Sequence, residues 1–222
     1  MRWLLILYLN HMKHKIFNEQ EYEKELKIIN IEKASTMGLM IMIPVFLLFG
    51  GVYILVNGNP LPEIFSSSLD IIKFLLGSFI LLVVFIAGAG LHELIHGITW
   101  SIFLENVFKS IKFGVLWKTL TPYCHSKEPM KIKHYMLGAI MPALLLGFAP
   151  AIWGIVVGSF WTTIFGILFT IAAIGDFMII QLLIKENMND YAEDHPSEAG
   201  CFVYRKRINE KIIVKSRYNS SK

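Results

Sequence analysis

The chain has 222 residues, of which 55% are hydrophobic and 17% are charged. Its mean hydropathy of +0.54 excludes an ordinary soluble domain of this length and is typical of a polytopic membrane protein. The net charge of +4 needs no nucleic acid to explain it, because basic loops beside an anionic lipid leaflet account for it. No interleaving of aromatic and basic residues points to RNA or DNA either.

The first 34 residues precede any span and are predicted to form a cytoplasmic N-terminal amphipathic segment. Met1 to Leu9 is a short apolar run without the small-residue cleavage site of a signal peptide, so we expect an in-plane anchor, or initiation at Met12 instead. Phe17 to Lys33 alternates Glu and Lys at helical spacing, which predicts an amphipathic surface helix.

Four apolar segments are long enough to cross about 30 Å of hydrocarbon. They are Ser35 to Asn57, Leu69 to Leu104, His134 to Gly158 and Trp161 to Ile184. The second is too long for one simple crossing, so it either tilts or continues beyond the membrane as a helix. Residues 35–184 are therefore the predicted transmembrane core, with residues 185–222 as a cytoplasmic C-terminal tail.

The basic residues indicate how the chain is oriented. They gather before the first span, between the second and third spans, and after the fourth, whereas none lies between Gly58 and Asp70 or in Ser159-Phe160. By the positive-inside rule, both termini and the central loop are cytoplasmic. We therefore expect a multi-pass protein of the cell membrane.

Alternating apolar residues in the central loop predict a β-strand or hairpin there. They are Phe108, Ile111, Phe113, Val115 and Trp117. The predicted fold class is an all-α membrane protein with about four transmembrane helices and a short cytoplasmic β-strand or hairpin between the second and third.

Cys124 and Cys201 fall in cytoplasmic segments, so no disulfide is expected. Four glycines are expected to permit close helix contacts: Gly88, Gly90, Gly97 and Gly175.

The second span contains the sequence His92-Glu93-Leu94-Ile95-His96, an HExxH motif. On a helix, two histidines four positions apart project from one face and can share a metal ion. In a zincin, the glutamate takes a proton from the attacking water and delivers it to the departing amine. The alternative is a helix with three polar residues that hydrogen-bond to neighbouring helices. In lipid that alternative is weaker, because an ionisable group near the bilayer centre costs about 2.5 kcal/mol or more.

A catalytic zinc site needs a third protein ligand. No histidine follows His96 before His125, and Asp176 is the only acidic residue in the fourth span. At about 1.5 Å per residue, His96 and Asp176 each lie about 14 Å from the cytoplasmic ends of their helices. The sequence therefore predicts that His92, His96 and Asp176 bind Zn²⁺ and that Glu93 is the catalytic base. The alternative for Asp176 is pairing with a lysine, or protonation and a hydrogen bond to the backbone.

These residues carry a family resemblance. The run His92 to Gly97, the pair Gly175-Asp176, and the loop pattern Phe113-Gly114 to Pro122-Tyr123-Cys124 resemble a family of small bacterial membrane proteins described as zincin peptidases. They resemble the site-2 proteases more remotely, in the core helices alone and with the usual Asp-Gly order reversed. The resemblance implies the same zinc ligands and the same base. It also draws attention to Asp194 and His195, which could act as a ligand or gate, although their surroundings favour a turn.

The predicted function is that of a membrane-embedded zinc metallopeptidase, which hydrolyses a peptide bond of a membrane-associated protein near the cytoplasmic face. A strand edge in the central loop could pair with a substrate in β form. The alternative is a non-catalytic metal-binding membrane scaffold, whereas a transporter fits four unrepeated spans poorly. The expected partners are a membrane protein or peptide substrate and the lipid bilayer. The sequence leaves the substrate, the cleavage site and the oligomeric state open.

Overall fold

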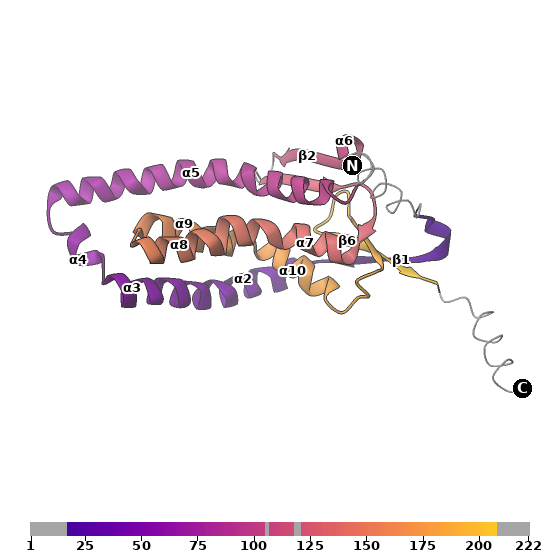
Figure 1. Cartoon of the computed structure of the whole chain (residues 1–222), viewed down its shortest axis with the longest axis horizontal. Helices are drawn as coiled ribbons and strands as arrows, with labels where there is room; N and C mark the ends of the chain where they lie inside the picture. The colour runs from indigo at the N-terminus through magenta and orange to yellow at the C-terminus, as the bar shows by residue number, and fades with distance from the viewer. Residues whose placement is uncertain (1–16, 105–106, 118–120, 208–222) are drawn as a thin grey trace, which may run out of the picture.

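In the computed structural model, described for residues 17–104, 107–117 and 121–207, apolar helices run along the long axis and two small sheets lie at one end (Figure 1). The helical elements are η1 (Glu19–Glu21), α2 (Ile31–Val45), η2 (Phe46–Gly50), α3 (Gly51–Asn57), α4 (Leu61–Ile64), α5 (Ser68–Ser101), α6 (Val107–Ser110), α7 (Ile132–Pro142), η3 (Ala143–Phe148), α8 (Ala149–Val157), α9 (Phe160–Ala172) and α10 (Ile174–Leu183). The strands are β1 (Tyr22–Ile28), β2 (Ile111–Leu116), β3 (Thr121–Ser126), β4 (Met130–Lys131), β5 (Tyr191–Asp194) and β6 (Gly200–Lys206).

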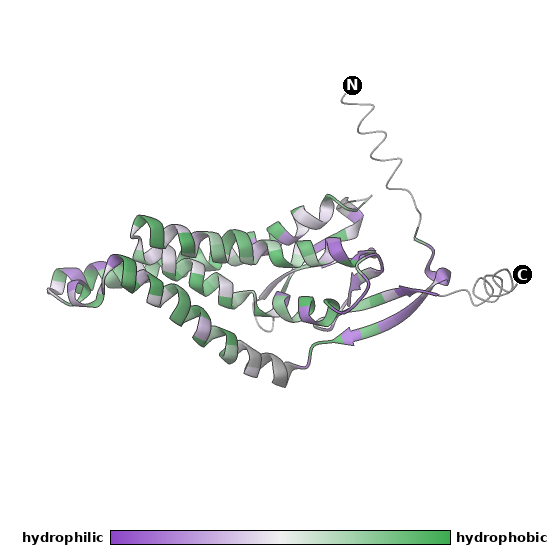
Figure 2. Cartoon of the chain, turned by 60° about the horizontal axis from the view of Figure 1, so that its bottom comes forward, coloured by the Kyte–Doolittle hydropathy of each residue, from purple (hydrophilic) through white to green (hydrophobic). Residues whose placement is uncertain are grey.

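Among the described residues, three helices are long and apolar enough to cross a membrane: Gly38–Asn57, Ser68–Ser101 and Ile132–Val157. A fourth candidate is the pair α9 and α10, which meet at an angle of 43°. Hydrophobic residues colour most of the helices, whereas hydrophilic residues gather at the end that carries the sheets (Figure 2). These helices match the four segments expected from the sequence and are consistent with a multi-pass membrane protein.

The helix α5 is continuous over 34 residues, a length of about 51 Å at about 1.5 Å per residue. It begins at the cap Ser67, whose side chain accepts a hydrogen bond from the backbone N–H of Asp70. Its first two thirds are mostly exposed, and its buried side chains concentrate in the last third, around the HExxH motif. The end of α5 that carries the motif is therefore the part that packs into the protein.

Two of the four glycines singled out in the sequence do permit close approach. A β-carbon at Gly88 would overlap an aromatic ring of α9, and one at Gly97 would overlap a ring of β2. By contrast, in the described part of the chain no heavy atom outside the local helix backbone lies within 4 Å of that position at Gly90 or Gly175. The prediction is wrong for these two residues.

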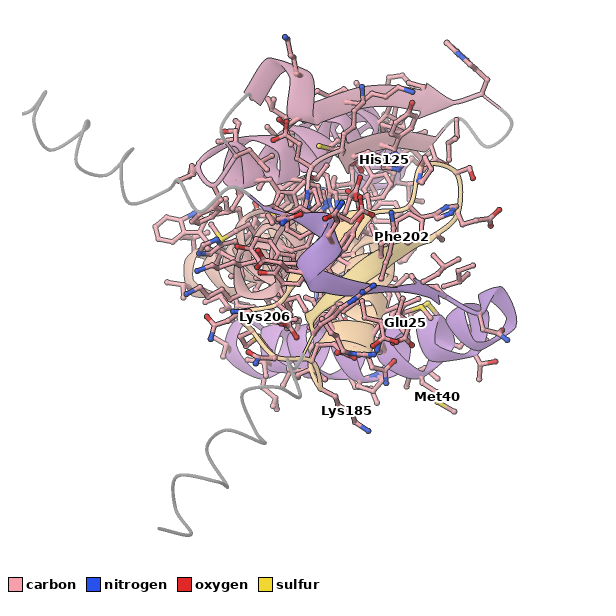
Figure 3. All side chains as sticks on the ribbon, turned by 90° about the vertical axis from the view of Figure 1, so that its right-hand side faces the viewer. Glu25, Met40, His125, Lys185, Phe202 and Lys206 are labelled. Carbon is pink, nitrogen blue, oxygen red and sulfur yellow. The ribbon has the colours of Figure 1, made fainter. Side chains whose placement is uncertain are left out.

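A four-stranded antiparallel sheet, ordered β1-β6-β5-β4, lies beside the two-stranded β2-β3 hairpin. The hairpin was expected, but the larger sheet was not, so the all-α fold class is corrected to a mostly helical protein with small antiparallel sheets. The predicted helix at Phe17 to Lys33 is wrong over Tyr22–Ile28, which pairs along its whole length with β6. The predicted anchor at Met1 to Leu9 lies outside the described residues. Figure 3 looks onto this end, with His125 of the hairpin above and Phe202 of β6 below it.

The largest buried cluster lies where the helices meet the sheets. It consists of Trp100, Leu104, Cys124, Met130, Ile132, Tyr135, Leu183, Ala192, Cys201 and Val203. Both cysteines are free and buried, and burial raises the pKa of Cys201 to about 12. This core joins the last turn of α5, the first turns of α7 and the larger sheet, and it therefore holds the HExxH motif against the strands.

An ion network ties the larger sheet to the end of α10. The guanidinium of Arg205 on β6 donates to both carboxylate oxygens of Glu186, at 2.7 and 2.9 Å. Lys27 on β1 donates to the same carboxylate at 2.5 Å and to the carbonyl of Leu182 at 3.3 Å. The hydrogen bonds from Arg205 and Lys27 lower the pKa of Glu186 to about 2. Strands from both ends of the described chain thus meet at one carboxylate.

Replacing Glu186 with glutamine is expected to lower the free energy of unfolding at pH 7 by about 1–2 kcal/mol, after allowance for the solvent that screens Arg205. Because the folded-state pKa of Glu186 is depressed, its contribution is present above the unfolded pKa of about 4.3 and is lost as the pH falls toward 2. Thermal unfolding of both proteins in detergent should therefore give melting temperatures that differ at pH 7 and converge in acid. A constant difference at all pH values would contradict this assignment.

Candidate metal centre

The three residues predicted as ligands lie together. His92 and His96 project from α5 and Asp176 from α10, and one donor atom from each lies within 4.8 Å of the others. His92 Nε2 is 3.1 Å from Asp176 Oδ2, and His96 Nε2 is 3.2 Å from Asp176 Oδ1. Both imidazoles are buried. Two imidazole nitrogens and a carboxylate oxygen that converge in this way form a donor set suited to zinc.

The orientation of His96 is fixed by α7. Its Nδ1 donates a hydrogen bond of 2.9 Å to the carbonyl of Gly138, which leaves Nε2 as the ring nitrogen that faces Asp176. A hydrogen bond of this kind from the second imidazole nitrogen selects the tautomer that binds a metal. The donor set therefore fits a zinc ion in its chemistry as well as in its spacing.

A stack of aromatic rings supports this imidazole. The His96 ring lies on the Trp100 indole with centroids 5.1 Å apart, and the indole lies on the Tyr135 ring at 5.3 Å. The indole N–H donates to the carbonyl of Tyr135 at 3.0 Å. A β-carbon at Gly138 would overlap the indole, so glycine is required where α7 crosses α5. Sequence reasoning missed these residues, although Trp100 stands one helical turn after His96.

Asp176 lies in the first turn of α10, directly after the break between α9 and α10. Ala173, at this break, is fully buried, and the two helices meet there at 43°. The change of direction lets the first part of this span, α9, pack along η3 and α8, while the second part, α10, presents a carboxylate to α5. The depth argument from the sequence therefore agrees with the geometry, although the role of Asp176 as a ligand stays a prediction.

Glu93 lies beside the three candidate ligands. Together with His96 and Asp176 it lines a cavity of about 150 Å³, which is also lined by residues 122–125 of β3. Its carboxylate accepts a hydrogen bond from the backbone N–H of Cys124. A carboxylate held next to the metal ligands, with open space in front of it, is positioned as a general base should be.

One edge of β3 faces this cavity. Along an antiparallel pair, alternate residues direct their N–H groups toward and away from the partner strand. The N–H of Cys124 is directed to Glu93, and that of Ser126 donates to Asp194 Oδ2 at 2.7 Å. Both therefore point away from β2, and Pro122, in the same alternating set, has no N–H to offer. The edge of β3 nearest to Glu93 is thus not paired with another strand in the described part of the chain.

Asp194 lines the cavity but does not join the cluster of donors. It ends β5, accepts hydrogen bonds from the Tyr135 hydroxyl and from the N–H of Ser126, and burial raises its pKa to about 6. The turn that the sequence favoured follows directly, since His195 Nδ1 accepts the N–H groups of Ser197 and Glu198. Asp194 therefore links the larger sheet, the hairpin and α7 around the site.

The comparisons with known proteins agree with this geometry. A family model described as "Putative zincin peptidase" matches residues 81–191, a stretch that contains Glu93 and all three candidate ligands. No curated protein and no solved structure matched the chain. The more remote similarity to the site-2 proteases stays a prediction.

Proposed function

The chain belongs to the Putative zincin peptidase family, and on this premise we propose that it is a membrane-embedded zinc metallopeptidase. Its substrate would be a membrane-associated protein, cut near the cytoplasmic face. The observation that carries the proposal is the convergence of His92, His96 and Asp176 from two helices, with Glu93 in the same cavity. Ligands alone suit a structural metal site, whereas ligands, a base and a cavity together suit hydrolysis.

Zinc at this position would supply a Lewis acid that polarises the scissile carbonyl and activates a water molecule. Glu93 would accept the proton of the attacking water and pass it to the departing amine. His96 would keep its orientation through the hydrogen bond to Gly138, and the buried aromatic stack behind it would exclude water from that side. Each of these roles falls to a residue whose contacts are described above.

The edge of β3 that carries no second strand in the described part of the chain supports a peptide substrate. This edge would bind the peptide through its carbonyl groups, because the N–H groups of Cys124 and Ser126 are already bonded to Glu93 and Asp194. An extended peptide can add to an unpaired strand edge through main-chain hydrogen bonds, and such a peptide would lie next to Glu93. A helical peptide hides its carbonyls in its own hydrogen bonds and must unwind before attack. Strand addition would hold the unwound stretch. The apolar helices support a location in the membrane, with the sheets and the site toward the cytoplasm by the distribution of Lys and Arg.

The non-catalytic scaffold remains the alternative, because the carboxylate of Asp176 links α10 to both imidazoles of α5 and a metal there would also hold the helices together.

Removal of the metal by a chelator distinguishes the peptidase from the scaffold. We expect 1,10-phenanthroline to abolish hydrolysis of a mixture of fluorogenic peptides by the purified protein in detergent. Added Zn²⁺, but not Mg²⁺, should restore hydrolysis, because nitrogen ligands suit zinc and disfavour magnesium. Hydrolysis that persists after the zinc has been removed would contradict the peptidase.

A further inference from the structure

Two cavities adjoin at Trp161, at the end of the bundle opposite the sheets. One is polar and the other is apolar. We propose that together they bind one phospholipid with a zwitterionic headgroup that carries an ammonium and a phosphate. The headgroup occupies the polar cavity and an acyl chain occupies the apolar groove. This inference rests on the membrane location in the proposed function and is independent of zinc and of hydrolysis.

The polar cavity has a volume of about 290 Å³ and lies among α3, α4 and the first turns of α5 and α9. Four aromatic side chains line it: Tyr53, Phe74, Phe160 and Trp161. Their rings contact one another, with centroids 6.1 Å apart for Tyr53 and Phe160, and 5.3 Å apart for Phe74 and Trp161. The Tyr53 hydroxyl donates to the carbonyl of Gly158 at 3.1 Å, which fixes that ring. Ammonium groups bind well against aromatic faces.

The charges of this cavity have both signs. Glu63 and Asp70 supply carboxylates and Lys73 supplies an ammonium. Asp70 already accepts hydrogen bonds from Ser66, Ser67 and Lys73 at the start of α5, so Glu63 is the carboxylate left to face a ligand cation. Lys73 is the only lysine or arginine in α5, and 65% of its side chain is exposed. One anion and one exposed cation complement the ammonium and the phosphate of a zwitterionic headgroup.

The apolar groove has a volume of about 670 Å³ and lies between α5 and the segment η3–α8, with α9 as its floor. Among the described residues, no charged side chain lines it. The helices α5 and α9 contact each other on both sides of it along the axis, where Gly77 meets Trp161 and Gly88 meets Phe169. The groove is therefore closed at its base and accepts a slender apolar ligand from the outside.

The position of the two cavities favours a lipid over a transmembrane helix. The polar cavity lies at the start of α5 and α9, where candidate spans begin and where the headgroups of a bilayer would lie. Trp161 and Tyr53 stand at this level, as Trp and Tyr do at membrane interfaces. A transmembrane helix in the groove would leave the charged groups of the polar cavity without partners. A phospholipid would fill the groove with an acyl chain and pair its headgroup with those charges.

Native mass spectrometry tests the proposal with the purified, delipidated full chain in detergent, as wild type and as Glu93→Gln. Both proteins should bind dioleoyl phosphatidylethanolamine at about tenfold lower concentration than dioleoyl phosphatidylglycerol, which lacks the ammonium. Glu63→Gln, which removes the carboxylate, and Ala149→Phe, which fills the groove, should each weaken phosphatidylethanolamine binding about tenfold, or about 1.4 kcal/mol. Ile152→Phe is the matched control, since Ile152 is exposed on the same helix and does not line the groove.

Three results would overturn the proposal. Equal binding of the two lipids would remove the role of the headgroup charge. Glycerophosphoethanolamine has the same headgroup but no acyl chains. If it bound as tightly as the lipid, the ligand of the polar cavity would be a soluble molecule. Unchanged lipid binding by Ala149→Phe, together with poorer cleavage of a membrane-anchored peptide, would assign the groove to a substrate helix. Because lipid binding is measured without catalysis, a wild-type protein that hydrolyses no peptide but still selects phosphatidylethanolamine would refute only the peptidase.

Discussion

Glu93→Gln is expected to abolish peptide hydrolysis and to leave the zinc content of the protein unchanged. Glutamine has nearly the same shape as glutamate and its carbonyl oxygen can still accept the hydrogen bond from the Cys124 N–H, but it cannot take a proton from water. A general base contributes about 10²–10⁴-fold to a rate, so kcat should fall by that factor or below detection. The measurement pairs the hydrolysis rate with metal analysis of the same purified sample.

Glu198→Gln is a suitable control for this variant, because Glu198 is exposed in the turn after β5 and should be dispensable for hydrolysis. Activity that survives in Glu93→Gln would favour the scaffold over the peptidase. Loss of zinc together with activity would also contradict the proposed role, because a base that is not a ligand should not be needed to hold the metal.

Asp176→Ala and His92→Ala are expected to lose bound zinc. Replacement of residues that only orient a ligand typically costs about 10–100-fold in metal affinity, so removal of a ligand itself should cost about 100-fold or more. Competition with a fluorescent chelator measures the affinity, and metal analysis gives the stoichiometry. Asp176 links two helices, so the melting temperature of the zinc-free protein should be recorded for each variant, to separate loss of a ligand from loss of the fold.

Asp194→Asn provides the sharpest control for the ligand assignment. Asp194 is an acidic residue of the same cavity, but its carboxylate is taken up by Tyr135 and Ser126 and lies outside the cluster of donors. This variant should keep its zinc. If zinc were retained in Asp176→Ala and lost in Asp194→Asn, the third ligand would be Asp194 and not Asp176. Equal zinc in every variant would refute the site.

The features that could be predicted from the sequence depend on local spacing. Apolar length indicated the spans, and the four-residue interval between His92 and His96 placed both on one helical face. Asp176 was found by comparing depth along two helices, which needs only helix rise and the direction of each span. The arrangement of these three side chains thus follows from one-dimensional information, because α5 and α10 are each unbroken between the site and the end of the helix.

The larger sheet could not be predicted in the same way. Tyr22–Ile28 alternates in a pattern that suits a helix surface with i to i+4 pairs and equally an edge strand with period two. The choice is made by β6, whose residues pair with β1 from Tyr22 opposite Lys206 to Ile28 opposite Gly200. The contact between Gly138 and His96 was missed for a related reason, since it depends on how α7 crosses α5 and not on either sequence alone.

The strand order also has a consequence for biosynthesis. The helices with the two histidines and the aspartate are made between β1 and β6, yet β1 pairs with β6 and β6 with β5. A growing chain can bring His92, His96 and Asp176 together while β1 still lacks its partner β6. The wall that contains Asp194 can close only after β5 and its partner β6 have been synthesised, so that the cavity beside Glu93 is completed later than the cluster of candidate ligands.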